Sequence, residues 1–209
     1  MNQNVNAKDA FNQLLEISVV PLAKDAGFQK SGLTFHRRTT DSTQVINFQL
    51  SRGNTSQECR FYVNVGIAFD ALFVLANEPI PKKTKEYECH FRQRLEKLVD
   101  GIPPIWRVTT ETDIKELSNF LSESLEVAIR MLESISSITD FSEHSWFKIP
   151  SAPSLPFLIF YALAEYEAAW QEIQDVSKRF SDRQGMTESD LIIRYNLEAL
   201  EPKIANPSA

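Results

Sequence analysis

The side chains best suited to chemistry in this sequence are two cysteines and three histidines, and their spacing gives them few ways to act together. Cys89 and His90 are adjacent, and consecutive side chains point in different directions on either a helix or a strand. They therefore cannot form a nucleophile and base pair with each other, and no thiol-enzyme motif supports a pairing of Cys89 with His36. We expect Cys89 to be a buried structural thiol and assign no catalytic residue.

Metal and phosphate motifs are also missing from the sequence. The available thiol and imidazole ligands are Cys59, Cys89, His36, His90 and His144. None of them shows paired ligand spacing, such as two cysteines separated by two residues. The chain has no glycine-rich phosphate loop and no serine nucleophile elbow. The sequence therefore predicts no metal and no cofactor.

Basic residues gather at two places in the first half of the chain. His90, Arg92 and Arg94 would share one face of a strand, whereas His90, Arg94 and Lys97 would share one face of a helix. Residues 36–38 add a second group, His-Arg-Arg. Such a patch could hold a small anion or the acidic side of a partner, and a solvated surface is the simpler interpretation.

The overall charge argues against one class of protein. The 209-residue chain has a formal net charge of -6 and a pI near 5.2, which rules out nucleic-acid binding through overall charge. The charge is uneven, because residues 24–107 carry 13 basic and nine acidic side chains while residues 108–209 carry eight and 17. We interpret this asymmetry as two surfaces that attract each other internally, or as two parts with different surroundings.

The elements that position these residues begin with a helix. Helical spacing predicts it from about Ala7, with Phe11 on its apolar face. Pro21 lacks a backbone N–H donor, so we expect a kink or a restart near Val20. Gly27 is expected to end the helix in a C-cap role.

Three segments with alternating apolar residues follow, and their short connections make them antiparallel hairpins. Their inward residues are expected to be Leu33, Phe35, Ile46, Phe48, Leu50, Phe61, Val63, Val65, Ile67 and Phe69. Their outward residues are expected to be His36, Arg38, Asn47, Gln49, Tyr62, Asn64 and Gly66. A loop centred near residue 55 or 56 places Asn47 opposite Asn64 and Gln49 opposite Tyr62. Because asparagine is depleted from strands, paired asparagines there need a partner.

The rest of the chain is mainly helical. Residues 82–101 allow a helix or a strand, and the recurrence of Tyr87, Phe91, Leu95 and Leu98 favours a short helix. Residues 105–108 predict an edge strand that contains Trp106. One long apolar stripe then consists of Ile114, Leu117, Leu121, Leu125, Ala128, Leu132 and Ile135. A second long helix is expected over residues 155–180, and a capping box at Thr187 and Asp190 begins a final helix to about Leu200.

Four short motifs in a fixed order suggest a family. They are GFQKSGLTF at residues 27–35, VINFQ at 45–49, FYVNVG at 61–66, and CHFRQR at 89–94 followed by Ile105-Trp106. Together they resemble the bacterial domain-of-unknown-function family numbered 4304 over about residues 7–135. That resemblance implies no activity, and members usually show a double tryptophan where this chain has Ile105-Trp106.

The sequence as a whole predicts an α+β fold. We expect an N-terminal helix, an antiparallel sheet of three to four strands and a C-terminal helical layer over the sheet's apolar face. Residues 1–209 are expected to form a single domain, with a helix-and-sheet part over 1–110 and a helical part over 111–209. A polar N-terminal start and two unpaired cysteines predict the cytoplasm, and the longest apolar run, about ten residues, is too short for a membrane span.

Two hypotheses of function follow from these expectations. The first is a non-enzymatic module that binds another protein through the polar sheet face and its basic rim. The second is an enzyme or sensor for a small anionic ligand held by Asn47, Asn64, Arg92 and Arg94. The candidate binding residues are His36, Arg38, Asn47, Gln49, Tyr62, Asn64, His90, Arg92, Arg94 and Trp106.

Overall fold

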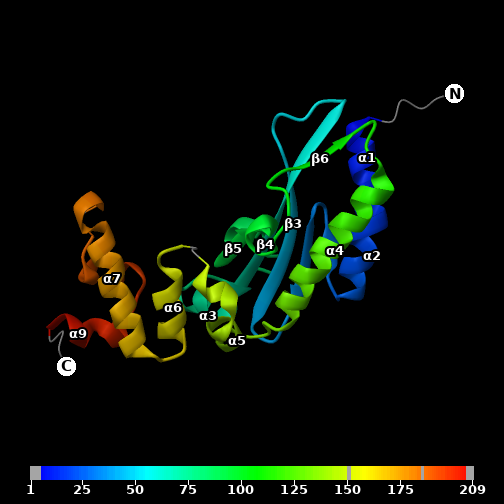
Figure 1. Ribbon diagram of the computed structural model, residues 1–209. Coiled ribbons are helices and arrows are strands. Elements are labelled where there is room, and N and C mark those ends of the chain that lie inside the picture. Colours follow the sequence, from blue (N-terminus) through cyan, green and yellow to red (C-terminus); the bar gives the residue numbers. More distant parts are fainter. Residues whose placement is uncertain (1–5, 150–151, 185, 206–209) are drawn as a thin grey trace.

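An antiparallel sheet of six strands forms the centre of the protein, as seen in the computed structural model (Figure 1). The structure describes residues 6–149, 152–184 and 186–205. The strands are β1 (Gln29–Ser31), β2 (Thr34–Arg38), β3 (Ser42–Leu50), β4 (Glu58–Phe69), β5 (Phe91–Arg94) and β6 (Trp106–Thr109). They follow the order β1-β2-β3-β4-β5, and β6 also pairs with β4. The α+β class is confirmed, and the sheet has more strands than predicted because β1 and β5 are too short to show an alternating pattern.

The predicted strand register is confirmed. Asn47 lies opposite Asn64, and Gln49 lies opposite Tyr62. The inner face of β3 and β4 is fully enclosed, since Phe48, Val63 and Val65 are each no more than 1% exposed. The alternation of apolar residues therefore set the side of the sheet on which each side chain lies.

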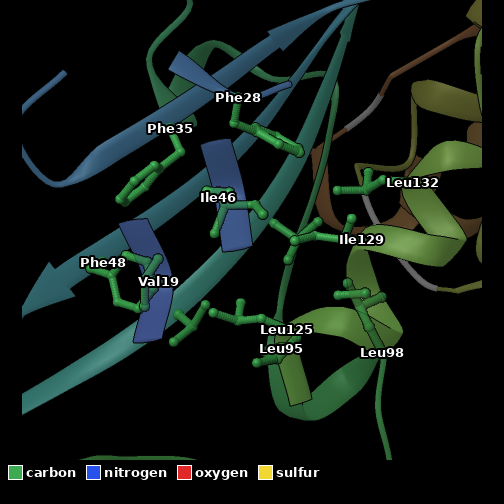
Figure 2. Packing of buried hydrophobic residues seen from close by; sticks show 14 of the residues in the cluster. Val19, Phe28, Phe35, Ile46, Phe48, Leu95, Leu98, Leu125, Ile129 and Leu132 are labelled. Atoms are coloured by element: carbon green, nitrogen blue, oxygen red, sulfur yellow. The ribbon is translucent and has the colours of Figure 1, made fainter. Parts of the chain in front are cut away.

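Two helical segments cover the apolar face of this sheet. The N-terminal one consists of α1 (Ala7–Leu14), a π-helical turn at Leu15–Val19 and α2 (Val20–Asp25). The other is α4 (Ile114–Glu133). In Figure 2, Leu125, Ile129 and Leu132 of α4 point toward the same core as Ile46 of β3 and Val19.

The predicted restart near Pro21 and the end at Gly27 are both confirmed. The π-helical turn lies directly before Val20 and Pro21, where the missing N–H of proline interrupts the regular helical ladder. Gly27 has a φ of 81°, which is the left-handed conformation that ends helices at little cost for glycine.

The prediction of a short helix within residues 82–101 is wrong. The segment contains β5, flanked by 3₁₀ turns at Glu86–Glu88 and Leu95–Lys97. Phe91 pairs with Ile67 of β4 and is fully buried, whereas Tyr87 is 65% exposed. Pairing with the free edge of β4 therefore outweighed the local helical spacing, because a distant strand supplied backbone partners and a core position for Phe91.

Five α-helices follow α4 in the described residues, and α6 among them contacts α3 (Asp70–Leu75). They are α5 (Ile138–Glu143), α6 (Leu155–Ala162), α7 (Tyr166–Gln184), α8 (Glu188–Arg194) and α9 (Glu201–Ala205). The helix expected over residues 155–180 is broken, since Ala164 has a φ of 59° and the Glu165 N–H donates to the Phe160 carbonyl at 2.8 Å. The capping box of Thr187 and Asp190 is confirmed, but its helix ends at Arg194 rather than near Leu200.

The predicted C-terminal layer over the sheet consists mainly of α4, together with Phe141 of α5 and Trp146, whose rings lie 5.0 Å and 5.7 Å from that of Phe91 in β5. Helices α6 to α8 and the residues after α8 bury a second apolar cluster, which consists of Phe157, Ala169, Trp170, Ile173, Val176, Leu191, Ile192, Leu197 and Leu200. In Figure 1 these helices lie beside the sheet rather than across it. The single-domain organisation of residues 1–209 stays a prediction. Among the described residues, no helix has the length and apolar character to cross a membrane.

Candidate functional site

The outer face of the sheet is crossed by residues 80–89, which we call the strap. His36 Nε2 donates to the Thr84 carbonyl at 2.8 Å, because a carbonyl oxygen can only accept. On the far side of the strap, Arg92 forms an ion pair with Glu86 at 3.4 Å. Val45, which shares this face with Asn47, is fully buried. The strap therefore divides the outer face into two open regions.

A glycine in β4 allows the strap to lie this close. A Cβ added at Gly66 would come within 2.6 Å of Cys89 Sγ, closer than atoms can approach. Cys89 is held against the sheet by this contact, and burial raises the pKa of its thiol well above the ordinary value. The thiol stays protonated at neutral pH, which disfavours a nucleophilic role.

The amides on the outer face bond mainly to one another. Asn64 is 4% exposed, and its Nδ2 donates to Asn47 Oδ1 and to Gln49 Oε1, both at 3.3 Å. Asn47 Nδ2 donates in turn to Thr34 Oγ1 at 2.8 Å. The amides thus connect strands β2, β3 and β4, which explains how two asparagines are accommodated at strand centres.

Beside these amides lies a pocket of about 350 Å³, which we call the Arg94 pocket. It is lined by Gln49, Asn64, Glu86, Arg92, Gln93 and Arg94. The Arg94 guanidinium lies over the Tyr62 ring, with its carbon 3.9 Å from the ring centroid. Within the described part of the chain, Arg94 has no carboxylate partner and donates no hydrogen bond. An aromatic ring therefore fixes the position of a cation whose donors remain available.

The structure excludes His90 from this basic group. The chain bends at His90 before β5 begins, and the ring stacks with Phe69 and meets Phe73 edge-on. His90 Nδ1 accepts a hydrogen bond from the Phe69 N–H at 3.0 Å, and burial lowers the pKa of His90 to about 4. The histidine is neutral at physiological pH, so its predicted place in a positive patch is wrong.

Trp106 is also outside the outer face. It is only 2% exposed and stacks on Phe61 with ring centroids 6.0 Å apart, on the apolar side of the sheet. The edge strand at residues 105–108 is confirmed as β6, but its tryptophan points into the core. Trp106 is therefore a packing residue.

The remaining predicted residues, His36 and Arg38, lie on the other side of the strap. They line a second cavity of about 450 Å³, which we call the lysine cleft. Its lining consists of Gly27, Gln29, Lys30, Ser31, His36, Arg38, Thr43, Ile80, Pro81, Lys82, Lys83 and Thr84. Sequence reasoning missed Lys30, Lys82 and Lys83, although the Lys82-Lys83 doublet was a visible signal.

Comparison with known proteins identifies the family. A family model described as a domain of unknown function (DUF4304) matches residues 19–134. The chain belongs to the DUF4304 family. The matched range contains the whole sheet, the strap and α4, and therefore every residue that lines the Arg94 pocket and the lysine cleft. No curated protein and no solved structure matched the chain.

Proposed function

We propose that this DUF4304 protein is a binding module without a chemical step of its own. In this proposal the outer sheet face takes an acidic segment of a protein partner at the Arg94 pocket. The observation that carries the proposal is the Arg94 guanidinium, which lies on Tyr62 and has no acceptor among the described residues. A guanidinium offers five donors in a planar fork that matches a carboxylate, so this side chain is prepared for an acidic group.

The contact with Tyr62 preorganises Arg94 for binding. A long side chain normally loses rotamer freedom when it binds, and the ring of Tyr62 has already restricted Arg94. Arg92 is two residues away on the same strand face and adds a second cation, partly neutralised by Glu86. The two arginines would therefore favour two acidic groups along an extended partner.

The composition of the pocket favours a partner over a reaction. Glu86 is the one acidic side chain among the described residues that line it, and it is already paired with Arg92. Small-molecule sites are mostly apolar, whereas five of these six residues are amides or arginines. The alternative, an enzyme or sensor for a small anion, has less support because Asn47 and Asn64 already bond to each other.

A labelled deca-glutamate peptide can test the proposal by fluorescence anisotropy. We expect Arg94→Ala to weaken peptide binding by about tenfold or more, since a hydrogen bond to a charged group contributes about 1.5–3 kcal/mol. Arg130→Ala is the matched control, because Arg130 is exposed on α4 beyond the opposite face. Equal peptide affinity of all three proteins would exclude the Arg94 pocket.

Competition with glutarate separates the two hypotheses. A short dicarboxylate can reach one arginine pair but not the rest of the face, so we expect it to displace the peptide only at a large excess. Displacement at concentrations similar to that of the peptide would favour the small-anion alternative. A bacterial cytoplasm remains the proposed setting, supported by the free cysteines Cys59 and Cys89.

A further inference from the structure

The lysine cleft collects cations in a protein that is acidic overall. Its basic lining residues are Lys30, Arg38, Lys82 and Lys83, with His36 beside them, and none of the described residues that line it is acidic. The chain as a whole has a formal net charge of -6. Cations grouped in a concave site repel one another and focus a positive potential, so the grouping needs a compensating partner.

Carboxylates from outside the cleft neutralise only part of this charge. Lys30 pairs with Glu16, and Arg38 forms a two-pronged ion pair with Asp70. For Lys82 and Lys83, no carboxylate partner exists among the described residues. Both lysines are exposed, and they lie at the start of the strap, directly after Ile80 and Pro81. Two ammonium groups therefore remain available at the mouth of the cleft.

On the sheet side of the cleft, Arg38 and His36 are held in place by hydrogen bonds. Arg38 is held by Asp70 and by Thr43 Oγ1, the latter at 3.2 Å. His36 donates from Nε2 to the Thr84 carbonyl, so the strap and β2 are joined at the base of the cleft. A ligand would thus meet Arg38 and His36, both held by contacts, on the sheet, and the two exposed ammonium groups of Lys82 and Lys83 on the strap.

We propose that the lysine cleft is a second binding site, for a small compound that carries two or more phosphate groups. Lysine binds phosphate as a point charge from a flexible stem, which suits Lys82 and Lys83. The volume of about 450 Å³ lies within the range of small-molecule sites. This site is separate from the Arg94 pocket, because the strap lies between them.

Calorimetric titration with sodium pyrophosphate at low ionic strength tests this site. We expect saturable binding by the wild type and a loss of affinity of about tenfold or more in Lys82→Ala/Lys83→Ala, since two charge contacts are removed. Lys97→Ala/Lys115→Ala is the matched control, because it removes the same charge at exposed positions outside the cleft. The control pair should bind pyrophosphate like the wild type.

Three results would overturn the proposal. The first is an absence of saturable pyrophosphate binding by the wild type. The second is an equal loss of pyrophosphate affinity in the two double lysine variants. The third is tighter binding of citrate than of pyrophosphate, which would indicate a site for carboxylates instead. Arg94→Ala separates this site from the proposed function: it should leave pyrophosphate affinity unchanged while weakening the acidic peptide. A loss of pyrophosphate binding in Arg94→Ala would contradict the separation of the two sites.

Discussion

Acidification should destabilise this protein through His90. The imidazole is half-buried against Phe69 and Phe73, and burial lowers its pKa from an ordinary 6.5 to about 4. The unfolded chain therefore binds a proton more readily than the folded protein. The contribution of a neutral His90 is fully present above pH 6.5 and is lost as the pH falls toward 4. The two pKa values correspond to about 3 kcal/mol at full protonation, of which about 2 kcal/mol is lost between pH 7 and pH 5.

A difference measurement isolates this effect. His90→Asn removes the titrating ring, and the asparagine Oδ1 can replace Nδ1 as the acceptor for the Phe69 N–H. Urea unfolding followed by tryptophan fluorescence gives the free energy of unfolding of both proteins at pH 7, 6 and 5. We expect the wild type to lose about 2 kcal/mol relative to the variant over this range. His36 and His144 occur in both proteins, so their protonation cancels in the comparison. Parallel pH profiles would refute the buried neutral histidine.

Three further substitutions test the fold and the outer face. Val63→Ala should lower the free energy of unfolding by about 1–3 kcal/mol, and an unchanged urea midpoint would contradict the strand phase. Asn64→Ala should lower the free energy of unfolding by about 1–3 kcal/mol, because Asn47 and Gln49 lose a buried hydrogen-bond donor. A melting curve measures this loss, and a variant as stable as the wild type would show that these hydrogen bonds contribute nothing to stability. Gly66→Ala should lower the free energy of unfolding by about 1–3 kcal/mol, because the added methyl group overlaps with Cys89. Adding Cys89→Gly should restore part of this loss. An unchanged free energy of unfolding in Gly66→Ala would mean that the strap moves freely.

The strands that the sequence predicted well are those joined by local turns. In β3 and β4 the apolar residues alternate over a long span, and one loop connects them, so pattern and loop length together define the register. The outer amides were found for the same reason, since Asn47 and Asn64 interrupt an otherwise strand-like pattern. Their partners were also predictable, because register alone places one amide opposite the other.

The features that the sequence did not predict depend on contacts between distant segments. Four residues of β5 are too few to display a period of two, and only the exposed edge of β4 makes them a strand. The strap depends on the fit of Cys89 against Gly66, which no local pattern encodes. His90 was assigned to the outer face from its spacing to Arg92, but a single bend before β5 directs its ring toward Phe69.

The ion pairs of the structure bear on the charge asymmetry between residues 24–107 and residues 108–209. If the acidic C-terminal half neutralised the basic half internally, many ion pairs would connect the two. Among the ion pairs of the described residues, Arg37 with Glu133 is the one that joins residues 24–107 to residues 108–209. Lys30 pairs with Glu16 of the N-terminal helical segment, and the remaining ion pairs each lie within one of the two parts. Helices α6 to α9 lie beside the sheet rather than over its outer face. Arg94, Lys82 and Lys83 therefore have no carboxylate partner among the described residues, as the two proposed binding sites require.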